Sequence, residues 1–135
     1  MAAAPLTGKC ALVTGAAGAI GTAIARSLQK AGVNVALLDI TADGLAALAG
    51  ELLGALEGGG KVLPITVDIS DAAAIEAAVG KIKEAEGFGA PDILINVAGI
   101  LSNNKLKETS LEVQRSSCFL DDFARHAVCT QSREP

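Results

Sequence analysis

Hydrophobic and polar residues alternate along the first hundred positions in blocks of strand length and helix length. Four short apolar runs, each bounded by polar residues, glycine or proline, predict buried strands. These runs are Cys10–Thr14, Asn34–Asp39, Lys61–Val67 and Asp92–Val97. Pro64 lies inside the third run. Because proline has no N–H for a ladder hydrogen bond, we expect that strand at an edge of its sheet.

Between these runs, apolar residues recur every three or four positions, which is the spacing of a helix face. The predicted faces are Ile20, Ile24, Leu28 and Ala31; Leu45, Leu48, Leu52 and Leu56; and Ile75, Val79 and Ile82. Gly32 is a stop signal for the first helix, Thr41 is suited to cap the second, and Ser70 or Asp71 begins the third. The alternation predicts an α/β fold with a doubly wound parallel sheet of the Rossmann type, ending after the fourth strand and one further helix.

Composition narrows the class of protein. Half of the 135 residues are hydrophobic and the net charge is -4, which excludes a disordered tail and gives no basic surface for nucleic acid. No apolar run reaches the roughly 18 residues of a membrane span, so no membrane partner is expected. Three cysteines are an odd number, so we expect a reducing, cytoplasmic environment. His126, Cys118 and Cys129 lack metal-ligand spacing, and no metal site is predicted.

A glycine-rich loop, T-G-A-A-G-A-I-G, joins the first predicted strand to the first predicted helix. Small residues let the backbone approach a ligand, and the start of a helix offers free N–H groups and the positive end of its dipole. This loop therefore predicts a diphosphate site. The candidate binding residues in it are Gly15, Ala17, Gly18, Ile20 and Gly21.

Asp39 ends the second predicted strand, roughly 20 residues after the loop, where a doubly wound fold places a carboxylate against ribose hydroxyls. Such a carboxylate would repel a 2′-phosphate, and no Lys or Arg lies in the loop or directly after Asp39. The pattern favours NAD over NADP. The alternative is that Asp39 only caps the following turn.

Taken with Asp68-Ile69 and Asn96-Val97-Ala98-Gly99, this loop and Asp39 resemble the short-chain dehydrogenase/reductase family over Gly8 to about Glu112. The resemblance implies that Asp68 and Ile69 edge the adenine, and that Asn96, Ala98 and Gly99 lie beside the adenosine ribose. For Asn96 a structural amide that ties neighbouring strands together is an equal alternative. Ala19 stands where the family's loop usually has glycine, and we expect it to be tolerated because a residue at a helix start need not have positive φ.

The resemblance implies that a complete member has a catalytic set of Ser and Tyr-x-x-x-Lys, with an Asn on the helix after the fourth strand. This chain contains no Tyr, and it has Leu120-Asp121 where that Asn is sought. No catalytic residue is therefore predicted. Complete members of the family are about twice as long as this chain. The resemblance implies substrates that are a small secondary alcohol and ketone or a 3-oxoacyl compound, as in 3-oxoacyl reductases and 3-hydroxyacyl or polyol dehydrogenases.

The likeness ends after Gln114. Thr109–Glu112 is typical of a capping box at a helix start, but the residues that follow share neither composition nor motif with the preceding hundred. We expect an NAD-binding half-domain over 1–109 and a divergent helix or tail over 110–135. A frameshift or gene-model error and a genuine short variant are alternative origins of that tail.

Three functions remain open from the sequence. The first is an oxidoreductase fragment that binds NAD without its catalytic set. The second is a non-catalytic NAD-binding or regulatory module, for instance one that forms oligomers with full-length relatives, and the third is a non-functional product.

Overall fold

The computed structural model describes residues 6–55 and 59–99. In these residues the chain forms β1 (Cys10–Thr14), α1 (Ala19–Lys30), β2 (Asn34–Asp39), α2 (Ala42–Ala55), β3 (Val62–Thr66), α3 (Ala72–Glu84) and β4 (Ile93–Asn96). β1 and β2 have the predicted bounds, whereas β3 and β4 are one residue shorter at each end. The predicted boundary at residue 109, the segment 110–135 and Leu56 lie outside the described residues.

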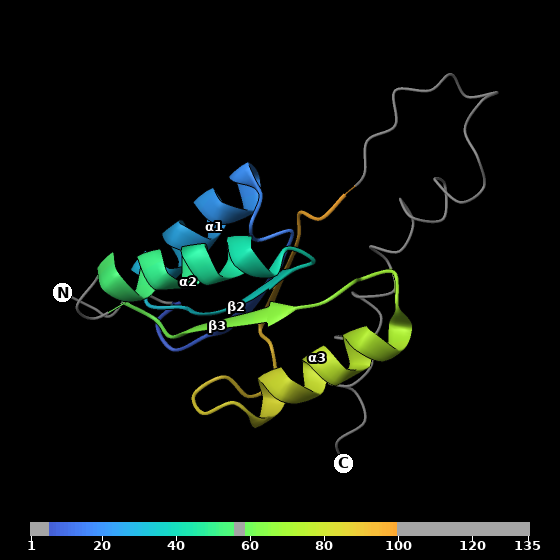
Figure 1. Ribbon diagram of the computed structural model, residues 1–135. Helices are drawn as coiled ribbons and strands as arrows, with labels where there is room; N and C mark the ends of the chain where they lie inside the picture. The colour runs from blue at the N-terminus through green and yellow to red at the C-terminus, as the bar shows by residue number, and fades with distance from the viewer. Residues whose placement is uncertain (1–5, 56–58, 100–135) are drawn as a thin grey trace, which may run out of the picture.

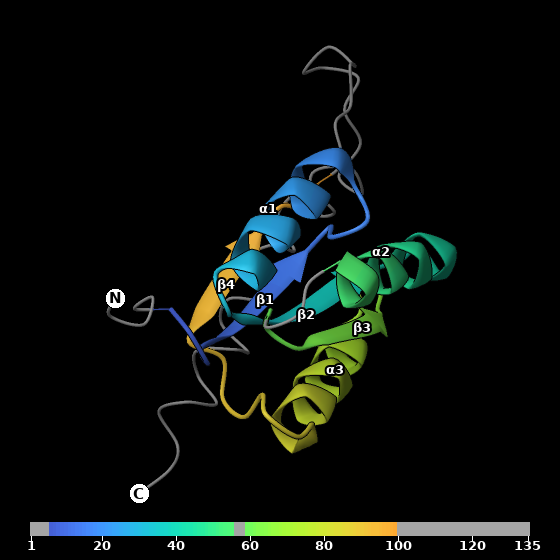
Figure 2. The same cartoon turned by 90° about the vertical axis from the view of Figure 1, so that its left-hand side faces the viewer.

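The four strands are parallel and lie in the order β3-β2-β1-β4. The chain moves from β1 through β2 to β3 in one direction, and α3 then carries it back to the other side of β1 (Figure 2). This reversal is the doubly wound arrangement that the sequence predicts, and it places a topological switch between β1 and β4. β3 is an edge strand of the described sheet, which confirms the position inferred from Pro64.

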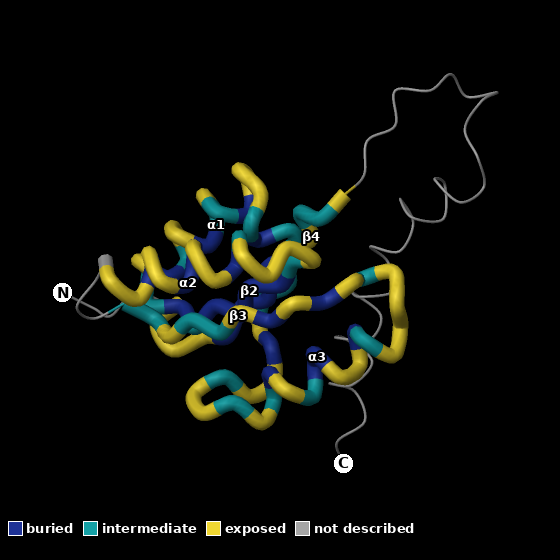
Figure 3. The backbone as a smooth tube through the Cα atoms, viewed as in Figure 1, coloured by how far each residue is buried: buried dark blue, intermediate teal, exposed yellow. Residues whose placement is uncertain are grey.

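Helices cover both faces of the sheet, with α1 and α2 on one side and α3 on the other (Figure 1). Alternate residues of β1 pack against the two helix layers. Ala11 and Val13 pack with the α1–α2 side, and Cys10 and Leu12 pack with α3. All five β1 residues are buried, as are the central four of β2 (Figure 3). Burial on both faces explains why these strands are continuous apolar runs.

Three of the four residues predicted for the buried face of α1 pack against the core, as expected, and the fourth, Ile20, does not. Ile20 is 67% exposed, and the buried residues of the helix are Gly21, Ala25 and Gln29. Small side chains at positions 21 and 25 let the helix lie close to the loop and the sheet, and this turns Ile20 outward. The predicted stop at Gly32 is confirmed. Gly32 has a φ of 83°, and the N–H groups of Gly32 and Val33 close the helix end by donating to carbonyls of its last turn.

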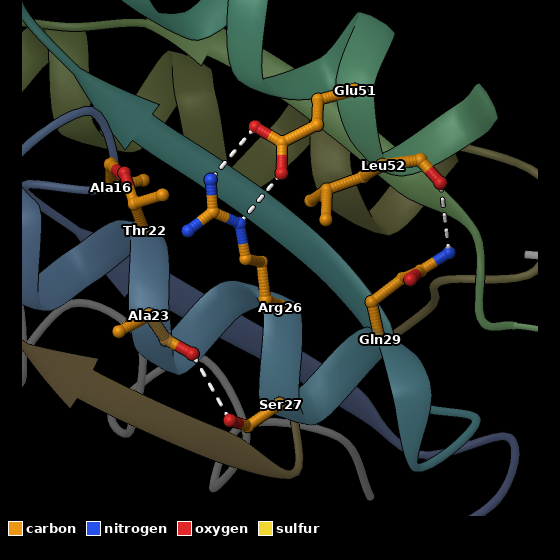
Figure 4. A network of polar contacts seen from close by, with 8 residues as sticks. All are labelled: Ala16, Thr22, Ala23, Arg26, Ser27, Gln29, Glu51 and Leu52. Carbon is orange, nitrogen blue, oxygen red and sulfur yellow. Dashed lines mark hydrogen bonds and ion pairs between the residues drawn. The ribbon is translucent and has the colours of Figure 1, made fainter. Parts of the chain in front are cut away.

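Polar contacts join α1 to α2 (Figure 4). The Arg26 guanidinium donates to both oxygens of Glu51, at 2.7 and 2.9 Å, on the exposed side. Deeper in, the Gln29 side-chain amide donates to the carbonyl of Leu52 at 3.3 Å. The exposed ion pair contributes little free energy by itself, but the two contacts together fix α1 against its neighbour.

α3 begins as the sequence predicts. Asp71 is its N-cap residue, and its carboxylate accepts the N–H groups of Ala73 and Ala74 at 3.0 and 3.3 Å. This decides between the two predicted starting residues. Ile75, Val79 and Ile82 are all buried against the sheet, which confirms the predicted face.

Candidate functional site

A cavity of about 650 Å³ lies at the carboxyl ends of the strands, next to the switch between β1 and β4. Four segments line it: residues 15 and 18–20 of the glycine loop and α1, 38–40 at the end of β2, 67–70 after β3, and 97–99 after β4. In open α/β sheets this is the place where ligands bind, because the connections diverge there and leave a crevice.

The glycine loop is held in place by contacts within the protein. The N–H of Ala16 donates to the Leu38 carbonyl at 3.1 Å, and the N–H of Gly18 donates to the Gly15 carbonyl at 3.2 Å. The Thr22 hydroxyl, one turn into α1, donates to the Ala16 carbonyl at 3.0 Å. The loop therefore has a defined path before any ligand is present.

The first N–H groups of α1 are free. Gly18 is the N-cap residue and has no side chain, and no acidic residue lies in the first turn. Within the described residues, the N–H groups of Ala19 and Ile20 have no protein acceptor, and both residues line the cavity. An uncapped helix start that opens into a cavity is suited to bind an anionic group.

Two glycines of the loop are required by close approach. Gly15 has a φ of 64°, and a Cβ there would lie 2.7 Å from the backbone nitrogen of Ala98. A Cβ on Gly21 would overlap the Gly15 carbonyl oxygen. Gly18 differs, because its added Cβ would only meet the Gly15 oxygen at 3.4 Å. Ala19 has negative φ like every other non-glycine residue described, so its methyl group is accepted as expected.

Both oxygens of the half-buried Asp39 accept backbone hydrogen bonds. Oδ1 accepts the N–H of Thr41 at 3.0 Å, which is the turn-capping contact considered from the sequence. Oδ2 accepts the N–H of Ala17 at 3.1 Å, across the mouth of the loop. A carboxylate oxygen can accept more than one hydrogen bond, so each oxygen retains capacity for a ligand hydroxyl.

The wall opposite the loop is formed by the residues after β3. Oδ1 of the exposed Asp68 accepts the hydroxyl and the N–H of Ser70, at 2.7 and 2.9 Å. These bonds, the hydroxyl foremost, hold the pKa of the Asp68 carboxyl below its ordinary value. Ile69 beside it is partly buried against the α3 layer, and Ile40 lines the cavity while 68% exposed. The wall thus combines one ionised carboxylate with aliphatic surface.

Thr14 fixes the fourth wall. This fully buried residue ends β1, and its hydroxyl oxygen accepts the N–H groups of Val97 and Ala98 at 3.2 and 3.3 Å. The segment after β4 is thereby drawn toward the loop, where Ala98 meets Gly15.

The structure brings most of the predicted binding residues together. Those that line the cavity are Gly15, Gly18, Ile20, Asp39, Asp68, Ile69, Ala98 and Gly99. The other three do not line it. The N–H of Ala17 is taken by Asp39, Gly21 packs against the loop from inside the helix, and Asn96 is exposed. No hydrogen bond of the Asn96 side chain is found within residues 6–55 and 59–99, so the strand-tying amide considered above gains no support there.

Sequence reasoning missed several residues of the site. Leu38, Ile40, Val67 and Ser70 line the cavity, and Thr14 supports it from beneath. Ile40 directly follows the predicted site residue Asp39, and Ser70 directly follows the predicted site residue Ile69, so their positions could have indicated them. Thr14 gave no signal of its own, because a polar residue at the end of a strand has many ordinary uses.

The opposite end of the sheet holds a buried thiol. Cys10, at the start of β1, is buried, and burial first and the charge of Asp92 second raise the pKa of its thiol to about 11. Such a thiol is not reactive near neutral pH. No group of His, Cys, Asp and Glu suited to hold a metal ion occurs in the part of the chain that the structure describes.

Comparison with known proteins gives the family. A family model described as short chain dehydrogenase matches residues 9–121. The chain belongs to the short-chain dehydrogenase/reductase family. The family binds nicotinamide dinucleotide cofactors, and the predicted resemblance is confirmed.

Two curated proteins are similar to this family member in sequence. The chain is 41% identical over 124 residues to D-threitol dehydrogenase of Mycolicibacterium smegmatis, which covers 92% of this chain and 46% of that protein. It is 43% identical over 95 residues to oxidoreductase UcpA of Escherichia coli, covering 70% of this chain and 34% of the relative. The chain thus spans less than half the length of these curated relatives.

Solved structures of the family superpose closely. A short-chain dehydrogenase/reductase of Serratia marcescens matches with a TM-score of 0.79 and 34% identity, over 93% of this chain and 51% of that one. L-sorbose reductase of Gluconobacter frateurii, solved with NADPH and L-sorbose, matches with a TM-score of 0.81 and 28% identity, over 95% and 49%. In this family member, none of the described helices is long and apolar enough to cross a membrane.

Proposed function

We propose that this chain binds a nicotinamide dinucleotide through the cavity at the start of α1 and prefers NAD to NADP. The observation that carries the proposal is the uncapped first turn of α1, which opens into the cavity beside the Asp39 carboxylate. The N–H groups of Ala19 and Ile20 bind the diphosphate, assisted by the positive end of the helix dipole. Gly15 and Gly21 have no side chain at the points where the loop lies closest to other backbone atoms.

The residues around the cavity fit the adenosine end of such a cofactor. Asp39 accepts the ribose hydroxyls, and the aliphatic side chains of Ile40, Ile69 and Val67 offer apolar surface to the adenine ring. The ionised Asp68 accepts a hydrogen bond from the adenine amino group. Ala98 and Gly99 present their backbone to the ribose, because small residues at these positions leave the cavity open.

The preference for NAD rests on charge. A 2′-phosphate would face the Asp39 carboxylate, and the described residues that line the cavity include no Lys or Arg to offset the repulsion. L-sorbose reductase is a relative solved with NADPH, so family membership by itself favours neither cofactor.

A bound nicotinamide would supply hydride acceptance and donation, and the residues described would hold the diphosphate and adenosine parts of the same cofactor. The substrates that we propose for the family chemistry are small secondary alcohols and ketones. A threitol dehydrogenase and a sorbose reductase among the relatives support polyols and sugars in particular. The 135 residues contain no Tyr to transfer the proton at the carbonyl oxygen. We therefore propose that this chain by itself binds the dinucleotide without turnover.

Calorimetric titration of the full chain with NAD and with NADP tests the binding proposal. NAD should bind at least about tenfold more tightly, a difference of about 1.4 kcal/mol. Absence of NAD binding, or equal affinity for NADP, would contradict it.

A separate assay tests the proposal about turnover. We expect no appearance of reduced nicotinamide absorbance when the chain and NAD are mixed with a panel of polyols and 3-hydroxyacyl thioesters. Any enzyme-dependent rate would show that a proton donor other than Tyr serves this chain.

A further inference from the structure

We infer that Asp39 positions the diphosphate loop as well as meeting the ribose, so that its carboxylate supports binding of ligands that have no ribose hydroxyls at all. The inference rests on the proposed function, because it concerns the same cavity. It adds a second task to a residue whose first task would be the choice between NAD and NADP.

The contacts that carry the inference join the glycine loop to the end of β2. Oδ2 of Asp39 is 3.1 Å from the N–H nitrogen of Ala17, and this is the hydrogen bond that the Ala17 N–H makes in the described structure. Ala17 lies directly before Gly18, the N-cap residue of α1. A second hydrogen bond joins the loop to β2: the N–H of Ala16, one residue before Ala17, donates to the Leu38 carbonyl. Asp39 therefore fixes the part of the loop nearest to the free N–H groups.

The second oxygen is occupied as well, and this limits what can replace the carboxylate. Oδ1 accepts the N–H of Thr41 at 3.0 Å, so the two oxygens face two separate backbone donors. An asparagine side chain has one oxygen and one NH₂ group, and its NH₂ would oppose one of these donors. Asparagine can therefore still satisfy one of the two backbone groups, whereas alanine satisfies neither, so alanine is the substitution that removes the contact with Ala17.

The charge of Asp39 and its hydrogen bonds have opposite effects on an anionic ligand. Near a diphosphate, a carboxylate repels, so neutralising it should strengthen binding of any ligand that lacks ribose hydroxyls. If Asp39 also holds the loop, truncating its side chain to alanine releases the Ala17 N–H and disorders the groups that bind the phosphates. The two roles predict changes of opposite sign, which makes them separable.

The probe is 2′,3′-dideoxy-ADP, with ADP as its hydroxylated counterpart, titrated calorimetrically against the full chain. For Asp39→Ala we expect about tenfold weaker binding of the dideoxy ligand, the size of losing one hydrogen bond to a charged group. Asp43→Ala removes the same charge and side chain from the exposed first turn of α2 and is the matched control; it should leave both affinities within about twofold.

The outcomes separate this inference from the proposed function. If the wild-type chain binds ADP but Asp39→Ala binds the dideoxy ligand as tightly as wild type or more tightly, the positioning role is wrong and the proposed function stands. If the wild-type chain binds neither ADP nor NAD, both are wrong.

Amide hydrogen exchange in the unliganded wild-type chain tests the same point without a substitution. The Ala17 N–H should exchange much more slowly than the free N–H groups of Ala19 and Ile20. Exchange of Ala17 at the rate of Ala19 would overturn the inference, even if the Asp39 variant failed to fold.

Discussion

Gly18 and Gly21 lie three residues apart at the start of α1, yet a methyl group added at each would meet different surroundings. At Gly21 it would overlap the Gly15 carbonyl oxygen inside the protein. At Gly18 it would have room within the protein, but it would stand at the wall of the cavity. We therefore expect Gly18 to matter for ligand binding and Gly21 for the fold.

Alanine substitutions should separate these two requirements. Gly21→Ala should lower the free energy of unfolding by about 1–3 kcal/mol, the usual cost of overpacking. Gly18→Ala should change it by less than about 0.5 kcal/mol while weakening NAD binding. Urea denaturation and calorimetry measure the two effects, and a Gly21→Ala chain as stable as wild type would contradict the packing argument.

Thr14 supports the site from a buried position, and its hydroxyl is the part that matters. Thr14→Val keeps the shape of the side chain but leaves the N–H groups of Val97 and Ala98 without that acceptor. We expect a loss of about 1–3 kcal/mol in unfolding free energy. Thr14→Ser keeps the hydroxyl and is the control, so equal destabilisation by the two variants in urea would argue against the hydrogen bonds as the cause.

At the scale of elements, the amino ends of β1 and β4 are joined by one carboxylate. Asp92 accepts the N–H of Cys10 at 2.9 Å and the Lys9 ammonium at 3.1 Å. The Cys10 bond first, and Lys9 second, hold the pKa of Asp92 below its ordinary value. This carboxylate lies at the end of the sheet away from the cavity, so its effect should fall on stability and not on binding.

The lowered pKa gives a pH dependence with a definite sign. The unfolded chain takes up the proton at about pH 4, before the folded chain does. The stabilisation by Asp92 is therefore complete above about pH 4 and is lost as the pH falls through the lower folded pKa. Asp92→Asn should reduce the acid-side slope of stability against pH, measured by urea denaturation across that range. Asp43→Asn is the charge-matched control, and an unchanged slope in Asp92→Asn would contradict the account.

Elements buried on both faces were predicted well, and the interior of the site was not. β1 and β2 are apolar runs between turn residues, and their bounds follow from that pattern alone. On α1 the predicted face failed at Ile20 alone: hydrophobicity favoured this residue, whereas close packing depends on the small size of Gly21 and Ala25. The bond between Asp39 and Ala17 was not predictable, because it depends on the path of the loop across the end of β2.

At the scale of the whole molecule, the doubly wound order brings four distant segments to one edge of the sheet. The loop after β1, the end of β2, and the segments after β3 and β4 meet around a single cavity. Each contributes a different property: free N–H groups, a carboxylate facing the loop, aliphatic surface, and a close backbone. This arrangement is the basis of our proposal that a chain without Tyr binds the dinucleotide without turnover.

The most direct test of this account is an NMR titration of the isotopically labelled full chain with NAD, following every assigned backbone amide. The account predicts that the amides of Ala19 and Ile20 shift most, together with those of residues 39–40 and 68–69, while those at the Cys10 end of the sheet stay in place. A titration that leaves the Ala19 and Ile20 signals unmoved at saturating NAD would contradict it.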